Sequence, residues 1–292
     1  MTKVAVISTK DRIYGVNKSL ELLNINPMKD KNVIFKPNFN TADPPPASSS
    51  METVKQLIIK IKEMGAKSIT VAERSGPANT TQTFKKKGLF ELAKDLNFGI
   101  IDLTDVSIED YVFKKPKDCH WKDGFLFAKI YDEAECIVET CCLKTHMYGG
   151  HFTISLKNAV GIVAKRNMSE LHSSKFQRKM IAEINSVYKA DLIIIDGIIA
   201  FVDRGPMEGT RKQANVFIAG TDKIALDAVG VAILRILGTT PEVSKGSIFE
   251  QEQIKRAVEL EIGIKNAHDI EFLTDSEDSE RLVKQIKEKL NE

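Results

Sequence analysis

Residues 133–161 read EAECIVETCCLKTHMYGGHFTISLKNAVG, a strand-like apolar run followed at once by lysines, histidines, cysteines and a Gly-Gly break. In open α/β sheets, ligands bind beyond the carboxyl ends of the buried strands. A chain that only needs to fold has no reason to collect titratable groups at such a point. The segment therefore predicts a buried strand at Cys136–Glu139 with a functional site directly after it.

Short apolar runs alternate with amphipathic stretches on both sides of this segment. Strands are expected at Val4–Ser8, Val33–Lys36, Ser68–Ala72, Asp191–Asp196, Val216–Ala219 and Ile270–Leu273. Helices are expected at Val16–Asn24, between Ser50 and Gly65, and at Thr80–Leu96, Phe152–Val163, Ser173–Tyr188, Ile224–Leu237, Gln251–Leu260 and Glu277–Leu290. Such alternation favours parallel crossover connections. We therefore expect an α/β fold with a mainly parallel twisted sheet flanked by helices, and a β-rich insertion at Ile101–Lys129.

The 292 residues fit one large α/β unit covering 1–292, with two lobes, 1–135 and 136–292, as the alternative division. Lys and Arg total 42 against 40 Asp and Glu, so a net charge of +2 gives no reason to expect a nucleic-acid partner. No apolar run is long enough for a membrane span, and the first residues lack the apolar core of a signal peptide. A cytoplasmic location is expected, while the oligomeric state is left open.

Polar side chains follow several of the expected strands, namely Lys36 with Asn38, then Glu73, Lys144 with His146, Asp196 and Asp222. The carboxyl ends of parallel strands share one sheet edge, so these groups predict a pocket for a small anionic metabolite. His146 is the candidate acid/base, and His151 is placed to alternate with it across the Gly149–Gly150 turn. Lys144 is the third candidate catalytic residue.

The expected helix after this turn carries Lys157 and Asn158 in its first turns, where both are candidates for binding the anion. Gly205 and Gly209, in the loop sequence GPMEG, predict a backbone that closely approaches a ligand. No phosphate-binding motif of the GxxxxGK[ST] type and no GxGxxG is present. A nucleotide cofactor therefore has no direct support.

The cysteines leave two alternatives open. Cys136, Cys141 and Cys142 lie in one strand and loop, so a redox or iron–sulfur protein with a redox partner is one interpretation. Their spacing matches no standard cluster or zinc pattern, and adjacent strand residues point to opposite faces, which favours packing. A divalent metal remains a candidate cofactor, with Asp196, His146 and Cys141 as its candidate ligands.

The order of motifs resembles the family called domain of unknown function 362. The resemblance rests on KPN at Lys36–Asn38, GAKSITVAE at Gly65–Glu73, LKTH at Leu143–His146, TISLKNAVG at Thr153–Gly161, DG at Asp196–Gly197, GPMEG at Gly205–Gly209 and DKIALDAV at Asp222–Val229. Many members carry a ferredoxin-like segment with four closely spaced cysteines, which this chain lacks. The family name implies no reaction. A fold-level analogy with nickel-dependent lactate racemases, whose sites use histidines and lysine, implies isomerase-like chemistry.

The leading hypothesis is an enzyme for a small carboxylated or phosphorylated metabolite, with acid/base chemistry that a metal assists if one is bound. Its proposed substrate-binding residues are Lys36, Asn38, Glu73, Lys157, Asn158, Gly205 and Gly209. The alternatives are the redox or metal-handling protein and a non-catalytic module that binds an anion or cofactor. The sequence does not decide whether the protein is an enzyme.

Overall fold

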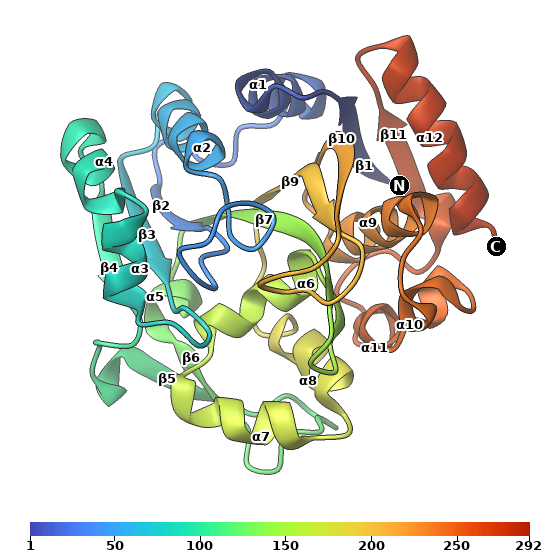
Figure 1. Cartoon of the computed structure of the whole chain (residues 1–292). Coiled ribbons are helices and arrows are strands. Elements are labelled where there is room, and N and C mark those ends of the chain that lie inside the picture. The colour runs from blue at the N-terminus through green and yellow to red at the C-terminus, as the bar shows by residue number, and fades with distance from the viewer.

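The computed structural model describes residues 1–292 as a central sheet between two layers of helices (Figure 1). The sheet has nine strands: β1 (Thr2–Ser8), β2 (Asn32–Lys36), β3 (Ser68–Glu73), β4 (Gly99–Asp102), β7 (Cys136–His146), β8 (His151–Thr153), β9 (Leu192–Phe201), β10 (Arg211–Gly220) and β11 (Ile270–Leu273). Their order is β11-β1-β10-β9-β7-β2-β3-β4, with β8 paired to β7. β2, from residues 1–135, pairs with β7, from residues 136–292, so the two ranges of the alternative division share one sheet.

Most neighbouring strands run parallel, which confirms the expected fold class. Two strands are exceptions. β10 is antiparallel to both β9 and β1, and β8 is antiparallel to β7. Because β10 runs against the other long strands, its carboxyl end lies at the edge of the sheet opposite to theirs.

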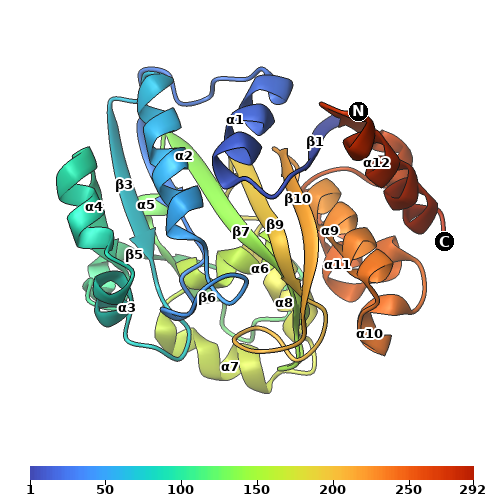
Figure 2. The same cartoon turned by 45° about the horizontal axis from the view of Figure 1, so that its top comes forward.

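The helices are α1 (Arg12–Leu23), α2 (Met51–Glu63), α3 (Thr80–Lys86), α4 (Leu89–Leu96), α5 (Lys129–Asp132), α6 (Ser155–Asn158), α7 (Met168–Ser173), α8 (Gln177–Ile184), α9 (Lys223–Leu237), α10 (Pro241–Ser244), α11 (Glu252–Glu259) and α12 (Glu277–Leu290). Figure 2 shows α1 and α2 on one face of the sheet and α9 and α11 on the other. The core is accordingly divided in two. A cluster of 24 buried residues lies beneath α1 and α2, and one of 48 lies beneath α6, α8, α9 and α11.

Alternating side chains of the central strands supply both clusters. In β9, Ile193 and Ile195 belong to the larger cluster, whereas Leu192 and Ile194 belong to the smaller one. A strand buried on both faces is a continuous apolar run, which explains why the LIIID sequence predicts it so clearly. None of the helices combines the length and the apolar character that a membrane-spanning segment needs.

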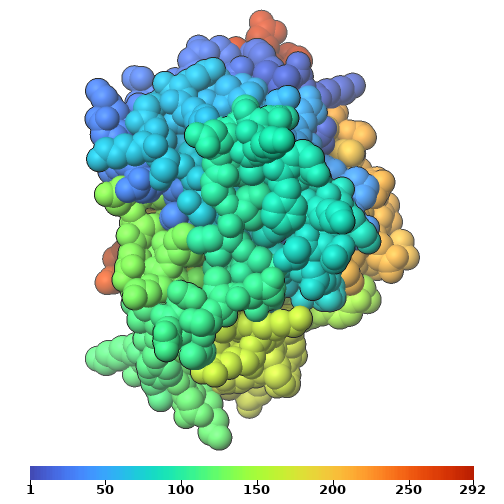
Figure 3. Space-filling model, turned by 90° about the vertical axis from the view of Figure 1, so that its left-hand side faces the viewer, coloured from blue at the N-terminus to red at the C-terminus, as the bar shows by residue number.

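The middle of the chain forms a small separate sheet of two antiparallel strands, β5 (Tyr111–Lys114) and β6 (Phe125–Ala128). Figure 3 shows the face built mostly from the N-terminal half of the chain, with the green region that contains this hairpin projecting at the bottom. The expected β-rich insertion is therefore present, although its first part, β4, joins the main sheet instead.

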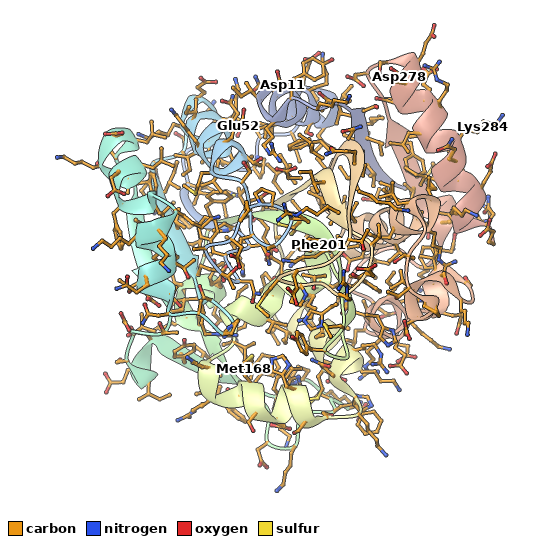
Figure 4. The ribbon with its side chains drawn as sticks, viewed as in Figure 1. Asp11, Glu52, Met168, Phe201, Asp278 and Lys284 are labelled. Carbon is orange, nitrogen blue, oxygen red and sulfur yellow. The ribbon has the colours of Figure 1, made fainter.

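Three expected helices differ from their predicted bounds. The expected helix Thr80–Leu96 is broken at Gly88, which adopts a left-handed conformation with φ of 70°. The expected helix Phe152–Val163 begins as strand β8 and contains only the short α6 followed by a 3₁₀ turn. The expected helix Ser173–Tyr188 is shorter at both ends and corresponds to α8, while α7, which carries the labelled Met168 in Figure 4, is a separate helix before it.

Two strands extend beyond their expected ends. β7 continues to His146 because it pairs with β9 as far as Lys144 and with β8 as far as His146, and all eleven of its residues are buried. β9 continues through Gly197 to Phe201, the residue labelled near the centre of Figure 4, where it pairs with β10. The prediction that Gly197 ends this strand is therefore wrong.

Candidate functional site

A small polar cavity lies beyond the carboxyl ends of β2, β3 and β7, where the first turn of α6 meets the sheet. Its volume is about 60 Å³. The 14 lining residues are Lys36, Asn38, Asn40, Glu73, Arg74, Gly76, Lys144, His146, Thr153, Lys157, Asn158, Val160, Gly161 and Pro206, of which one is hydrophobic. A single water needs roughly 10–15 Å³, so the cavity holds roughly four to six non-hydrogen atoms.

Lys36 and Glu73 form a buried ion pair in the wall of the cavity, with Nζ and Oε1 2.9 Å apart. Glu73 also accepts hydrogen bonds from the backbone N–H groups of Phe39 (3.1 Å) and Arg74 (2.8 Å). A Cβ at Gly161 would lie 2.3 Å from Glu73 Oε1, so only glycine permits this close packing. Lys36 and Glu73 face the cavity, but each side chain already has the other as its ion-pair partner.

A hydrogen-bond chain of fixed polarity runs along another wall. Lys144 Nζ donates to Asn38 Oδ1 (3.0 Å), and Asn38 Nδ2 donates to Asn158 Oδ1 (3.2 Å). Asn158 Nδ2 in turn donates to Glu139 Oε2 (3.0 Å). Every donor points toward Glu139, which fixes the orientation of both amides. Lys144 also donates to the carbonyl of Ala47 (2.6 Å), so its third N–H is left for the cavity.

Glu139 anchors this chain from inside the core. Although burial alone would raise its pKa, the ammonium of Lys223, 2.7 Å away, brings the pKa of Glu139 below its usual range. Tyr188 donates a further hydrogen bond to the same carboxylate (2.8 Å). Lys223 also donates to Asn185 Oδ1 (3.0 Å) and to the Tyr188 hydroxyl. Lys223, Tyr188 and Asn185 line a second cavity of about 350 Å³ on the far side.

His146 ends β7 and is buried against the cavity. Its Nδ1 accepts a hydrogen bond from the backbone N–H of Gly150 (3.3 Å), which places the ring proton of the neutral imidazole on Nε2. Burial, and then the positive charges of Lys157 and Lys144, lower the pKa of His146 well below its usual range. In the absence of a ligand the ring is therefore neutral at physiological pH and donates from Nε2.

Lys157 projects from α6 with only 8% of its surface exposed. Burial, followed by repulsion from Lys144 and Arg74, lowers the pKa of Lys157 to about 7. No acidic group or hydrogen-bond acceptor offsets this effect. The amine is thus an unpaired polar group inside a cationic cavity, an arrangement that disfavours its charged form.

Two further cavity residues have polar atoms without a partner. Asn40 Nδ2 and Thr153 Oγ1 are both buried and make no hydrogen bond. An unsatisfied buried donor or acceptor costs about 1–3 kcal/mol, which a ligand that bonds to it recovers. Asn40 was missed by sequence reasoning because it lies in an extended proline-rich loop. Thr153 was visible only as the first residue of the TISLKNAVG motif.

The short helix α6 is held in place by a buried carboxylate. Asp227 of α9 accepts hydrogen bonds from the backbone N–H of Ser155 (2.7 Å) and from its hydroxyl (2.5 Å). Burial raises the pKa of Asp227 to about 6, although the hydrogen bonds from Ser155 oppose that shift. This contact fixes the turn from which Lys157 and Asn158 reach the cavity.

Arg74 lines the cavity but binds the following loop with its guanidinium. Its Nε donates to the carbonyl of Val163 (2.9 Å), and one terminal nitrogen donates to the carbonyl of Val160 (2.7 Å) and contacts Met168 Sδ (3.1 Å). Sequence reasoning passed over this residue because nothing distinguishes one arginine after a strand from a surface residue. Its charge nevertheless adds to the positive potential of the cavity.

Of the expected site residues, Lys36, Asn38, Glu73, Lys144, His146, Lys157 and Asn158 are brought together around the cavity. His151 does not line it, although it pairs with His146 across the β7–β8 hairpin. Its backbone is in the left-handed region, with φ of 60°. Burial, followed by the charge of Arg178, lowers the pKa of His151. The Gly149–Gly150 turn thus folds His151 back beside His146, as predicted, but His151 does not line the cavity.

The loop after β9 contributes Pro206 rather than a glycine. Gly205 packs on the backbone of Thr145, where a Cβ would lie 2.1 Å from the carbonyl oxygen. Gly209 packs equally closely on the carbonyl of Asp203. Both glycines permit close chain packing beside the cavity, and neither lines it.

Asp196 and Asp222 lie elsewhere than expected. Asp196 is inside β9 rather than at its end, and it accepts hydrogen bonds from Arg12 Nε and Thr53 Oγ1, both at 2.8 Å. Asp222 follows the antiparallel strand β10, so it lies at the opposite sheet edge, where it caps α9. The prediction that Asp222 lies at the pocket is wrong because β10 runs antiparallel to β1 and β9.

The side chains around the cavity do not fit a metal site. No three His, Cys, Asp or Glu residues lie close enough to hold an ion together. Asp196 is paired with Arg12, and Cys141 is buried in the larger core cluster away from His146. The cavity offers one histidine and three lysines. Both carboxylate oxygens of Glu73 already accept hydrogen bonds from protein groups.

The four cysteines are free thiols, and three of them are buried. Burial raises the pKa of Cys136 to about 12 and that of Cys141 well above its usual range. Cys141 faces the larger core cluster, whereas the charges near Cys142 belong to Lys144 and Asp196 on the other face. Protonated, buried thiols are poor nucleophiles and poor metal ligands.

A family model described as Domain of unknown function (DUF362) matches residues 33–232, a range that contains every residue lining the cavity. A curated relative is the thylakoid-associated protein sll1697 of Synechocystis sp., which is 24% identical over 215 residues. That alignment covers 70% of this chain and 63% of the relative, so the chain matches less than two thirds of the relative's length.

Among solved structures, the lactate racemase apoprotein from Thermoanaerobacterium thermosaccharolyticum aligns with a TM-score of 0.50. The alignment covers 97% of this chain and 85% of that chain, at 15% sequence identity. At this level of identity, the likeness shows a shared α/β fold and no more.

Proposed function

Since this chain belongs to the DUF362 family, whose description names no reaction, we propose its function from the cavity. It is an enzyme that binds a small carboxylated or phosphorylated metabolite and moves a proton on it, as an isomerase or racemase does. The observation that carries this proposal is the buried Lys157 amine, which has no partner inside a polar cavity of about 60 Å³.

The balance of charge in the cavity favours an anion. Lys36, Arg74, Lys144 and Lys157 face one carboxylate, Glu73, which is paired with Lys36. A carboxylate or phosphate supplies the missing negative charge, and its oxygens also accept hydrogen bonds from the unpartnered groups. The volume restricts the ligand to about six non-hydrogen atoms.

His146 is the proposed acid/base, because it is the histidine that lines the cavity with the free lysine. A Cβ added to Gly150 would lie 2.8 Å from Lys157 Cε and 2.9 Å from His146 Nδ1, so the two side chains are neighbours. A bound anion would offset the lysine charges that lower the pKa of His146. Its pKa would then move back toward neutrality, where an imidazole exchanges protons efficiently.

The structural neighbour supports the reaction class by analogy alone. The aligned protein is a lactate racemase, and racemisation of such an acid breaks and re-forms the carbon–hydrogen bond next to its carboxylate. No contact of Cys136, Cys141 or Cys142 favours the redox alternative. A metal is not needed for the binding role derived from the lysines.

The test is hydrogen exchange between small acids and solvent. Purified protein is incubated in deuterated buffer with two- and three-carbon hydroxy and oxo acids, which fit the cavity, and proton NMR follows loss of the carbon-bound protons next to the carboxylate or the ketone. We expect exchange with at least one acid and its loss in His146→Ala. His268→Ala removes an exposed histidine and serves as the matched control.

The same experiment separates the alternatives. If calorimetry detects binding of an acid but no exchange occurs, the protein is a non-catalytic binding module and the enzymatic proposal is wrong. If His146→Ala binds and exchanges like the unmodified protein, the role of His146 is wrong. Absence of binding for every acid in the panel would contradict the anion site itself.

A further inference from the structure

We propose that the Lys157 amine is a nucleophile that forms a covalent imine with small 2-oxo carboxylic acids. This names a substrate class for the cavity and rests on the proposed function. It adds a covalent step that neither the family description nor the fold likeness assigns.

The position of the amine is the first support. Lys157 is more than nine-tenths buried, projects from a helix turn fixed by Asp227, and donates to no protein group. Structural lysines of this protein behave differently. Lys36 pairs with Glu73, and Lys223 pairs with Glu139, so each has a carboxylate within 3 Å. Lys157 is built into the fold without such a partner.

The protonation state of the amine is the second support. Only a neutral amine has the electron pair that attacks a carbonyl carbon. With its pKa at about 7, roughly half of Lys157 is neutral at pH 7, whereas roughly one in three thousand molecules of an ordinary lysine is neutral there. Burial together with neighbouring cations is a recognised way to activate a lysine for this chemistry.

The shape and chemistry of the cavity supply the rest of the substrate class. The free N–H of Lys144 and the unpartnered Asn40 Nδ2 and Thr153 Oγ1 are suited to a carboxylate. A three-carbon 2-oxo acid has six non-hydrogen atoms, which is the upper end of what the cavity holds. Its carbonyl is bonded directly to the carboxylate, so holding one end presents the other to the nearby amine.

The step balances without an oxidant or reductant. The electron pair of Lys157 Nζ forms a bond to the carbonyl carbon, and the carbonyl oxygen leaves as water with the two protons of the amine. His146, beside the lysine side chain, is placed to transfer one of these protons. Hydrolysis by the reverse route releases the acid. The imine draws electrons from the neighbouring carbon, which makes proton removal there easier.

The experiment is reductive trapping with pyruvate as the probe. The full-length protein is incubated with pyruvate and sodium cyanoborohydride at neutral pH, and the product is examined by intact mass and peptide mapping. We expect one adduct per chain, located on Lys157, with labelling at least tenfold above that of any exposed lysine. Acetate has a carboxylate but no ketone, so it should slow the labelling by competition.

Matched variants make the result specific. Lys157→Arg should lose the adduct, while Lys165→Arg, which changes an exposed lysine nearby, should keep it. Because peptide mapping of the unmodified protein locates the adduct directly, the test does not depend on how well Lys157→Arg folds. The inference would be overturned by labelling on Lys144, or by equal labelling of every lysine as in urea-unfolded protein.

Failure of this inference can be told apart from failure of the proposed function. If pyruvate and acetate bind in calorimetry but no adduct is trapped, the covalent step is wrong and the anion site stands. If neither acid binds and none is trapped, both proposals fall.

Discussion

Replacement of Lys157 by methionine should stabilise the unliganded protein at neutral pH. The pKa of Lys157 falls from 10.5 to about 7 on folding, which means that the folded state disfavours the charged amine. A tenfold loss of proton affinity corresponds to about 1.4 kcal/mol, so the buried site of this lysine costs folding roughly 4 kcal/mol at about pH 7. Methionine has a similar length and no charge, and it removes that cost.

The stability difference between the two proteins should depend on pH. The unfolded chain binds a proton at Lys157 more readily than the folded chain does between about pH 7 and the unfolded pKa of 10.5. The stability of the unmodified protein therefore rises with pH across that window, and the advantage of the variant shrinks to roughly 1–2 kcal/mol near pH 9.5.

Urea unfolding of both proteins at about pH 7 and about pH 9.5 measures this difference. Lys165→Met, at an exposed position, provides the control for removal of a charge as such. A Lys157→Met variant that is less stable than the unmodified protein at both pH values would refute the reasoning. A difference that does not change with pH would refute it equally.

Three other perturbations test separate parts of the structure. Glu139→Gln leaves the Lys223 ammonium buried without its counter-ion, so urea titration should show a free energy of unfolding lower by about 3–5 kcal/mol. Adding Lys223→Met should recover most of that loss. A double variant as unstable as Glu139→Gln would contradict the pairing. Gly161→Ala drives a methyl group into Glu73 and Lys36, so we expect a loss of about 1–3 kcal/mol with weaker acid binding in calorimetry, and unaltered binding would count against this cavity wall. Asp196→Asn weakens the contact with Arg12, so it should reduce stability while leaving acid affinity within about twofold. Abolished acid binding would instead mean that Asp196 takes part in the binding site.

Sequence pattern predicted the architecture well where a strand or helix is decided by its own residues. β11 and α12 have the predicted bounds, because each is a short periodic run between clear turn residues. The ends of β7 and β9 were missed, since pairing with a neighbouring strand extends them through residues that alone predict a loop. Strand direction was missed for the same reason. Nothing local in Arg211–Gly220 distinguishes an antiparallel partner from a parallel one.

The cavity was predictable to the extent that its residues follow parallel strands. Lys36, Glu73, Lys144 and His146 are such residues, and they do converge. Which of them are free was not predictable, because that depends on partners distant in the chain. Glu73 is neutralised by a lysine 37 residues away, whereas Lys157 has no counter-ion at all. Charge pairing across the fold, rather than residue type, separates the structural groups from the available ones.

The smallness of the cavity has a consequence for how a ligand will be found. The best small ligands gain about 1.5 kcal/mol per non-hydrogen atom, so six atoms give at most about 9 kcal/mol, or a dissociation constant of about 10⁻⁷ M. With ordinary association rates, such a complex dissociates within seconds to minutes. A non-covalent metabolite would therefore be lost during dialysis and chromatography. Screens that add acids back to purified protein should succeed where a search for a co-purified compound returns nothing.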